Sequence, residues 1–349
     1  MRHAARYVVE THAHISTLYE PVEAKSKNWQ GVAVPVDNSA MCLYDMERYG
    51  IDMTFIKPPS QIGPPNEMHA EMVDRHPDKF RAFCTDQTQK LKVAQGEAEW
   101  DIDSSAAEVD AALATGRFIG IGEFVPRDWD PRKIYTFEER LGEFRIFMEL
   151  ARKHGVTIDY HEFSGGYEWD HWRLLARLAA EYPDVPIIVC HAGHSGGAHD
   201  DGPNQLRNVL RVTGGAWRNG RNNIYLETGT WPAEFFKIAM DDPNVGVTQL
   251  IWGGDYGSRQ YILTSPGRDG ATFATFMRKW QLVAPYQVDW WGTSLHRIDK
   301  VRDFATQDEI NLILGGNAAR LFNLPMPHDR MFMRGRPDAW GVYWEDSLP

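Results

Sequence analysis

Residues 118–163, FIGIGEFVPRDWDPRKIYTFEERLGEFRIFMELARKHGVTIDYHEF, contain one complete strand–helix–strand pattern. The apolar runs at 118–124 and 156–163 each have the length of a buried strand. Between them, residues 138–154 place apolar side chains along one helical stripe, and Gly155 follows where helices commonly end. A helix between two buried strands is typical of a parallel βαβ unit.

The same alternation runs through most of the chain. Predicted strands lie at residues 7–10, 51–56, 80–84, 118–124, 156–163, 186–194, 223–228 and 249–255. Predicted helices lie at residues 41–49, 66–76, 104–115, 138–154, 170–182, 204–212, 232–240 and 269–283. Eight such units in a chain of 349 residues predict a (β/α)8 TIM barrel, an α/β fold. A doubly wound open sheet is the competing architecture.

Two stretches are longer than ordinary loops, residues 15–40 after the first strand and residues 284–306 after the last barrel helix. We expect both to shape a substrate site, because long loops in TIM barrels commonly do so. Residues 307–323 predict a closing helix. These features indicate one catalytic domain over residues 1–325. Residues 326–349 then form a C-terminal extension on the surface or on a neighbouring subunit, which makes a homodimer plausible.

The composition limits the function. A formal net charge of −11 argues against nucleic acid or an anionic membrane as the partner. Thirteen Trp favour a small apolar or aromatic substrate, although aromatic residues also fill cores. Three cysteines without a close pair and an N-terminus without a signal-like apolar run indicate a cytoplasmic protein.

Histidine and carboxylate side chains stand at the C-terminal ends of several predicted strands, where TIM barrels place their active sites. These residues are Glu10, His12, His14, Glu123, His161, His191, His194 and Asp255. In the first strand, alternation predicts that Glu10, His12 and His14 face the same way. Buried polar groups are costly unless they are satisfied, and a shared cation satisfies them. Imidazole and carboxylate ligands suit Zn, Mn or Fe.

The donor set is larger than one tetrahedral ion requires. Two divalent ions bridged by Glu123 would use all of it. One ion, with the remaining groups acting as acid, base and orienting groups, would also account for it. Cys190 precedes His191 in the same predicted strand, so strict alternation predicts that its thiol faces away from this site.

The order of these residues resembles the amidohydrolase superfamily. The H-x-H motif at residues 12–14 is followed by His161, His191 and Asp255 on successive strand ends. The sequence around that motif, VVETHAH, and the segment GGNAARLFNL (315–324) resemble amidohydrolase family 2. That branch includes aminocarboxymuconate-semialdehyde decarboxylase.

The resemblance implies roles for individual residues. His12 and His14 would bind the first metal, and His161 would be a further ligand. His191 would bind a second metal or act as a catalytic acid or base. Asp255 would bind metal and accept the proton of the attacking water.

Two features differ from the common pattern of the family. GIGEF (120–124) is similar to the motif of TatD-like dinuclear hydrolases, whose Glu bridges two metals, and this implies that role for Glu123. Glu10 stands where most hydrolases of the superfamily have Asp. We expect it either to be a further metal ligand or to accept a backbone hydrogen bond. The candidate substrate-binding residues are His194, Glu227, Trp231 and Arg259.

The leading hypothesis is a metal-dependent hydrolase with two ions, Fe, Zn or Mn, that cleaves a carbonyl-type bond through metal-activated water. An alternative is a dinuclear non-heme iron monooxygenase that hydroxylates a bulky hydrophobic substrate. A further alternative is a non-oxidative decarboxylase of an aromatic or unsaturated acid. A non-enzymatic barrel with a structural metal clamp would have a closed ligand shell.

Overall fold

The structure is a computed structural model that describes most of the chain from residue 6 to residue 325. The described segments are residues 6–15, 17–20, 32–35, 37–59, 63–124, 136–161, 168–192, 206, 210, 223–229, 231–257 and 290–325.

Eight parallel strands pair in sequence order around one sheet. They are β1 (Val9–Ala13), β4 (Met53–Ile56), β5 (Phe80–Cys84), β6 (Phe118–Phe124), β7 (Thr157–Tyr160), β8 (Ile187–Val189), β9 (Ile224–Glu227) and β10 (Leu250–Ile251). The first and last strands meet through backbone hydrogen bonds from Thr11 to Trp252 (3.1 Å) and from Tyr256 to His12 (3.0 Å). The sheet therefore closes, which confirms the TIM barrel and excludes the open doubly wound sheet.

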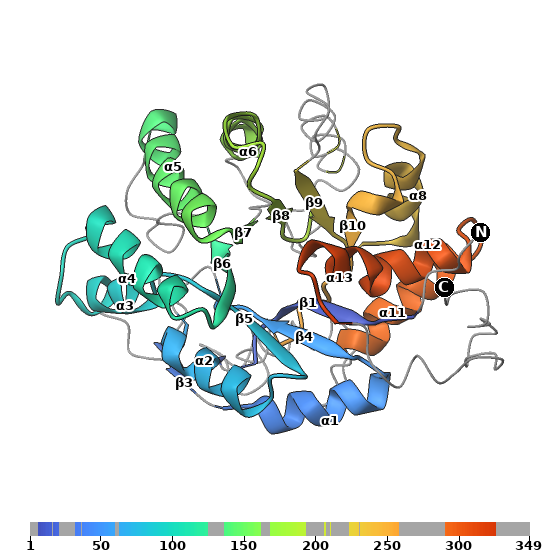
Figure 1. The fold of residues 1–349 in the computed structure, drawn as a ribbon, viewed down its shortest axis with the longest axis horizontal. Helices are drawn as coiled ribbons and strands as arrows, with labels where there is room; N and C mark the ends of the chain where they lie inside the picture. The colour runs from blue at the N-terminus through green and yellow to red at the C-terminus, as the bar shows by residue number, and fades with distance from the viewer. Residues whose placement is uncertain are drawn as a thin grey trace, which may run out of the picture.

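Helices lie around the outside of the strands, as Figure 1 shows. They include α1 (Ser39–Tyr49), α2 (Asn66–Arg75), α3 (Gln87–Gln95), α4 (Ile102–Ala114), α5 (Phe137–His154), α6 (Glu168–Glu181) and α8 (Ala233–Asp241). Six of the predicted helices correspond to members of this set. The predicted helices at 204–212 and 269–283 fall outside the described residues, apart from residues 206 and 210, which are helical. Among the described residues, no helix is both long and apolar enough to cross a bilayer.

Local sequence explains the bounds of α5. Thr136 and Glu139 form a capping box: the Thr136 hydroxyl accepts from the Glu139 amide, and the Glu139 carboxylate accepts from the Thr136 amide. Gly155 ends the helix in the left-handed conformation, with φ of 66°. The predicted apolar stripe is buried against the barrel and consists of Leu141, Phe144, Phe147, Met148 and Ala151.

The prediction of a loop over residues 284–306 holds for residues 302–306 but is wrong for residues 290–301. Residues 290–301 form α11 (Trp290–Val301), and residues 284–289 lie outside the described segments. Trp291, Ile298 and Val301 are buried along one side of this helix. Their spacing of seven and three residues is helical, so the periodic signal was present in the sequence.

Helix α3, which was not predicted, lacks such an apolar stripe. Its buried side chains include Gln87, Gln89 and Lys90 beside Val93. Polar residues that become buried only through tertiary contacts give no hydrophobic period, which explains why the pattern missed this helix.

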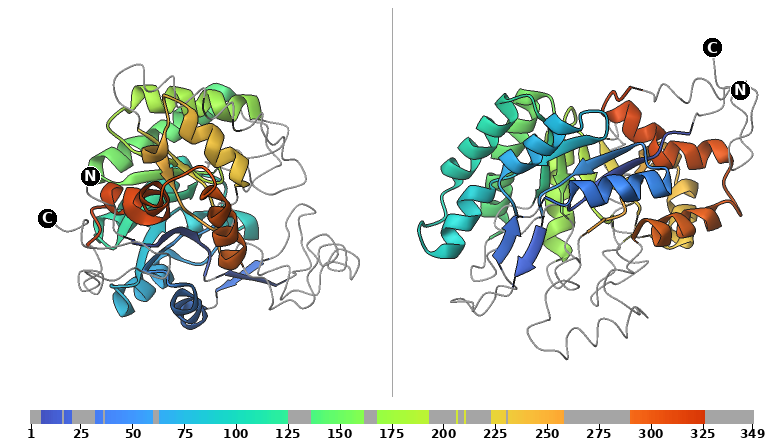
Figure 2. Two further views of the ribbon diagram at one scale, coloured as in Figure 1. Left: turned by 90° about the vertical axis from the view of Figure 1, so that its right-hand side faces the viewer. Right: turned by 90° about the horizontal axis from the view of Figure 1, so that it is seen from below.

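The segment after β1 is more ordered than a simple loop. Strands β2 (Thr17–Glu20) and β3 (Val32–Pro35) form an antiparallel hairpin within the predicted loop 15–40. The hairpin stands beyond the end of the barrel strands (blue in Figure 2). The predicted closing helix is confirmed as α12 (Gln307–Asn311), η3 (Leu312–Gly316), a π-helical turn, and α13 (Asn317–Leu321). The proposed C-terminal extension, 326–349, falls outside the described residues.

Inside the barrel, an apolar layer lies apart from the polar strand ends. Its buried members are Tyr7, Val9, Met53, Phe55, Phe83, Ile188, Ile251 and Ala318. Phe322, which follows α13, packs edge-on against Phe55 at 4.7 Å between ring centroids. The closing helix therefore fills one end of the barrel with hydrocarbon and leaves the other end for polar side chains.

We expect Gly315→Ala to destabilise the protein, because a Cβ at this position would lie 1.7 Å from the backbone oxygen of Tyr7. Overpacking of this kind typically costs about 1–3 kcal/mol. Gly142→Ala, within α5, is the matched control: nothing lies within 4 Å of its added Cβ. This control should stabilise the helix by about 0.5–1 kcal/mol. Urea unfolding of both variants tests the prediction, and equal stabilities would contradict it.

Candidate metal centre

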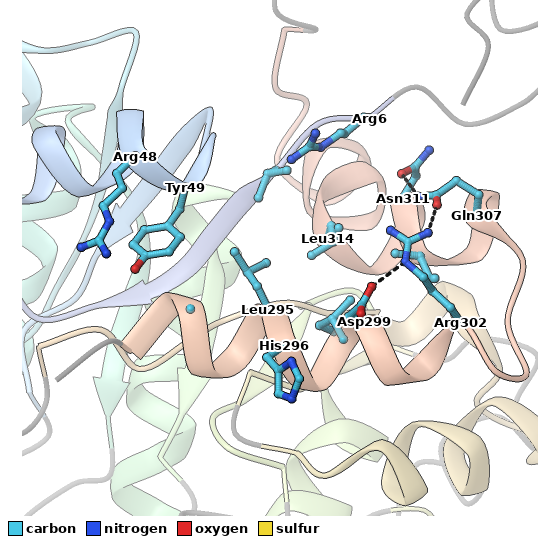
Figure 3. Close-up of a pocket in the computed structure, with 14 residues that line it drawn as sticks. Arg6, Arg48, Tyr49, Leu295, His296, Asp299, Arg302, Gln307, Asn311 and Leu314 are labelled. Carbon is cyan, nitrogen blue, oxygen red and sulfur yellow. Dashed lines mark hydrogen bonds and ion pairs between the residues drawn. The ribbon is translucent and has the colours of Figure 1, made fainter. Parts of the chain in front are cut away.

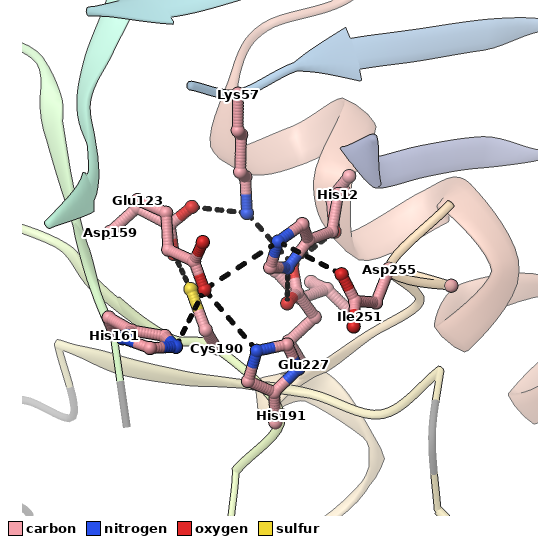
Figure 4. A network of polar contacts seen from close by, with 12 residues as sticks. His12, Lys57, Glu123, Asp159, His161, Cys190, His191, Glu227, Ile251 and Asp255 are labelled. Atoms are coloured by element: carbon pink, nitrogen blue, oxygen red, sulfur yellow. Dashed lines mark hydrogen bonds and ion pairs between the residues drawn. The ribbon is translucent and has the colours of Figure 1, made fainter. Parts of the chain in front are cut away.

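Six of the predicted ligands converge at the C-terminal ends of the barrel strands, and Figure 4 labels all of them except His14. They are His12, His14, Glu123, His161, His191 and Asp255. Their potential ligand atoms form two groups, His12–His14–Asp255 and Glu123–His161–His191. Within each group these atoms lie within 4.8 Å of one another. Both groups combine imidazole nitrogen with carboxylate oxygen, which suits zinc, manganese or iron.

The carboxylate of Glu123 connects the two groups. Its Oε1 lies 3.0 Å from His161 Nε2 and 3.3 Å from His191 Nε2. Its Oε2 lies 3.5 Å from His14 Nε2. Because the two oxygens face different histidines, Glu123 has the placement that a bridging ligand requires.

The Nδ1 atoms of His12 and His14 both face acceptors. His12 Nδ1 lies 2.5 Å from Glu227 Oε2, and His14 Nδ1 lies 2.9 Å from the backbone oxygen of Lys57. A carboxylate and a carbonyl can only accept, so Nδ1 is the donor in both rings. When the rings are neutral, both Nε2 atoms are therefore acceptors.

These two Nε2 atoms lie only 3.0 Å apart. Asp255 Oδ1 lies 3.7 Å from the Nε2 of His12 and 3.5 Å from that of His14. Acceptors that face each other in this way need a proton or a metal ion between them. The residues present therefore fit a bound divalent metal.

The electrostatics of the cluster also favour a cation. Burial lowers the pKa of the His12 imidazole, but the charges of Glu227 and Glu123 raise it to about 10. Burial raises the pKa of Glu123, but the imidazoles of His161 and His12 hold it well below its usual value. The site thus stabilises positive charge at the His12 ring and negative charge on Glu123.

Two of the converging residues have unusual backbone conformations. His191 and Asp255 have φ of 58° and 54°, in the left-handed region that non-glycine residues seldom adopt. Such conformations cluster at functional sites and are held by their surroundings. The indole of Trp231 helps hold one of them: its Nε1 donates to the backbone oxygens of His191 and Ala192, each at 3.1 Å.

The prediction that Cys190 faces away from this site is wrong. Its Sγ lies 2.8 Å from Asp159 Oδ1, and its sulfur lies within 4.8 Å of ligand atoms of His12 and Glu123. The strand ends at Val189, so regular alternation does not extend to Cys190 and His191.

Strand β1 is also irregular, because its pairing register with β4 shifts between Glu10 and Ala13. The carboxylate of Glu10 accepts from the amides of His12 (2.7 Å) and Gly254 (2.7 Å) and from the Trp291 indole. Glu10 is not among the potential metal-binding groups of the described residues. Through these hydrogen bonds, Glu10 connects β1 with the segment after β10 and with α11.

The predicted substrate-binding residues that the structure describes are both fully buried. Glu227 Oε1 accepts from Thr11 Oγ1 (3.0 Å) and Lys57 Nζ (2.9 Å), while its Oε2 faces His12. Trp231 is fully buried, and its indole donates a hydrogen bond to the backbone oxygen of His191. These contacts are with protein groups rather than with an open pocket. His194 and Arg259 lie outside the described residues.

Sequence reasoning missed Lys57 and Asp159, which lie fully buried and ion-paired beside the cluster. A usable signal existed for Asp159, because it lies two residues before His161 and shares its face of the predicted strand. Lys57 directly follows the apolar run MTFI, a position at the end of a barrel strand.

The cluster is unevenly exposed. Among its side chains, His161 and Asp255 keep 18% and 13% of their surface accessible, whereas His12 has none. Among the described residues, the cluster is therefore most accessible at His161 and Asp255.

A separate cavity of about 410 Å³ lies among the segment before β1, α1, α11, α12 and η3, and none of the cluster residues lines it (Figure 3). Arg6, Arg48 and Arg302 line it together with apolar side chains such as Leu295 and Leu314.

The family model described as Amidohydrolase matches residues 9–324, so the chain belongs to the amidohydrolase family of enzymes. No curated protein has a sequence that matches this chain.

Several solved structures share the fold at low identity. One is a probable 2-pyrone-4,6-dicarboxylic acid hydrolase from Acinetobacter baumannii, 13% identical with a TM-score of 0.52, covering 90% of this chain and 99% of the other. Another is a mutant of a PTE-like lactonase from Deinococcus radiodurans, 16% identical with a TM-score of 0.53, covering 92% and 97%. A TatD homologue from Escherichia coli is 13% identical with a TM-score of 0.52, covering 91% and 98%. At these identities the likeness establishes the shared fold.

We expect His14→Ala to weaken Zn²⁺ binding by more than about 100-fold, because removal of a direct ligand exceeds the 10–100-fold loss typical of outer partners. His154→Ala is the control, since His154 pairs with Asp110 at 2.6 Å on the outside of the barrel. Competition with a chromogenic chelator measures both affinities. Unchanged binding in His14→Ala would place the metal elsewhere.

Proposed function

We propose that the protein is a metal-dependent hydrolase with a dinuclear centre that cleaves a carbonyl-type bond of an apolar or aromatic substrate. The observation that carries this proposal is the pair of three-ligand groups connected by the two oxygens of Glu123. Within the family, we place the chain in the branch of aminocarboxymuconate-semialdehyde decarboxylase, with the bridging Glu of TatD-like enzymes.

His12, His14 and Asp255 would hold one divalent ion, and Glu123, His161 and His191 the other. A divalent ion bound there supplies Lewis acidity and lowers the pKa of water. Fe, Zn and Mn are all compatible with these donors.

Asp255 is the proposed proton acceptor. Burial raises the pKa of its carboxyl group, but a hydrogen bond from His14, when that ring is protonated at Nε2, and the charge of His191 lower it to about 2. Asp255 is therefore ionised at neutral pH, and its partial exposure places it at the open side of the cluster. A carboxylate there can accept a proton during hydrolysis. His191 would either hold the second ion or, with one ion bound, stabilise negative charge on the substrate.

We expect Asp255→Asn to reduce kcat for hydrolysis by about 10²–10⁴-fold, the usual contribution of a general base. The assay follows aryl esters, lactones and anilides at saturating metal, so that weaker metal binding does not limit the rate. Asp242→Asn, on the turn after α8, is the control and should leave kcat unchanged. An undiminished rate in Asp255→Asn with metal still bound would refute the assigned role.

Glu123→Gln should reduce the bound metal from two ions to one per chain, because an amide offers only one oxygen to bridge them. Glu143→Gln, a buried carboxylate on α5, serves as the control and should keep two ions. Mass spectrometry of the native protein and elemental analysis count the ions. Two tightly bound ions in Glu123→Gln would contradict the bridging role.

The same measurements distinguish the alternatives. Two Fe per chain with substrate-dependent O₂ uptake would favour the monooxygenase, which the imidazole and carboxylate donors also permit. One ion per chain with CO₂ release from an aromatic or unsaturated acid would favour the decarboxylase. Bound metal without an exchangeable water position would favour the structural clamp.

A further inference from the structure

We propose that Lys57 positions both histidines of the H-x-H motif for metal binding. Its backbone oxygen orients His14, and its ammonium group orients His12 through Glu227. This inference rests on the metal site of the proposed function, but it does not depend on which reaction that site catalyses.

Lys57 lies immediately after β4, and its side chain is fully buried inside the barrel (Figure 4). Its Nζ pairs with Asp159, on β7, and lies 2.9 Å from Glu227 Oε1, on β9. The ammonium group therefore connects three strands of the barrel. A buried lysine of this kind is tolerated only because carboxylates compensate its charge.

The contact with His12 passes through Glu227. Lys57 Nζ and Thr11 Oγ1 both donate to Glu227 Oε1, which fixes the carboxylate in one orientation. Its Oε2 then accepts from His12 Nδ1 at 2.5 Å. An ion-paired carboxylate cannot donate, so the His12 proton stays on Nδ1 and Nε2 remains available for metal. Carboxylates that orient metal-binding histidines in this way raise metal affinity.

The contact with His14 is direct. His14 Nδ1 lies 2.9 Å from the backbone oxygen of Lys57. The amide of Lys57 donates to the backbone oxygen of Ala13 at 2.9 Å, between the two histidines. The backbone of Lys57 is thus attached to the H-x-H segment, and its carbonyl leaves only Nε2 of His14 for metal.

The charges explain why a lysine is needed. Asp159 and Glu227 both contact the Lys57 ammonium group, and without it the two buried carboxylates repel each other. Glu227 then loses its fixed position beside His12. A neutral side chain of the same length would keep the backbone contact with His14 but remove the contact that acts on His12.

We expect Lys57→Met to weaken Zn²⁺ binding by about 10–100-fold, the usual effect of losing an outer partner of a metal-binding histidine. Lys90→Met is the matched control. Lys90 is also fully buried and pairs with Asp86 at 3.2 Å, but it lies on α3 outside the barrel. Its replacement removes a buried charge of the same kind and should leave zinc affinity unchanged. Competition with a chelator measures both variants, with circular dichroism as the check on folding.

A second measurement covers the case in which Lys57→Met fails to fold. In the zinc-loaded protein labelled with [¹⁵N]histidine, His12 and His14 should each retain a proton on Nδ1 and bind through Nε2. Glu227→Leu keeps the pair between Lys57 and Asp159 and the backbone contact with His14. It should move the Nδ1–H resonance of His12 upfield and leave that of His14 in place.

The outcomes separate this inference from the proposed function. Wild-type affinity in Lys57→Met, or a His12 ring that is unprotonated at Nδ1, would overturn the role of Lys57. Failure of the wild-type protein to bind Zn²⁺ or any other divalent ion would instead overturn the proposed function. Equal losses of zinc affinity in Lys57→Met and Lys90→Met would reduce the effect to general destabilisation and refute the positioning role.

Discussion

Acceptor atoms that face one another inside a barrel need positive charge between them, and this requirement organises the described part of the molecule. The Nε2 atoms of His12 and His14 lie 3.0 Å apart beside the carboxylates of Glu123 and Asp255. A divalent ion would satisfy this group, because it offers positive charge to several of these acceptors at once. The Lys57 ammonium group likewise compensates the negative charges of Asp159 and Glu227 beside it.

Closure of the barrel assembles the first of the two ligand groups. His12 and His14 belong to the first strand, whereas Asp255 follows the last one, 241 positions further along the chain than His14. Backbone hydrogen bonds between the His12–His14 segment and Tyr256 hold these strands together. Metal affinity and the integrity of the barrel seam are therefore coupled: a bound ion should stabilise the closed barrel by mass action.

The site departs from regular geometry at several of its ligands. The register of β1 shifts after Glu10, and His191 and Asp255 adopt left-handed backbone conformations. Where the regular strand ends at Val189, neighbouring residues no longer alternate, so Cys190 and His191 both face the cluster. Surrounding contacts, such as the two hydrogen bonds from Trp231 near His191, hold the irregular backbone in place.

The sequence by itself determined the strand–helix order, the bounds of α5 and the kinds of residue at the strand ends. These features depend on local periodicity, capping and composition, as Thr136, Gly155 and the apolar stripe of α5 illustrate. Only the tertiary structure decided which partners these residues have. Glu227 accepts from His12 Nδ1, Glu10 connects β1 with the segment after β10 and with α11, and Lys57 lies between two buried carboxylates. The physical reason is that such partners come from strands far apart in the chain. Their contacts depend on closure of the barrel and on local breaks in alternation, which no local pattern records.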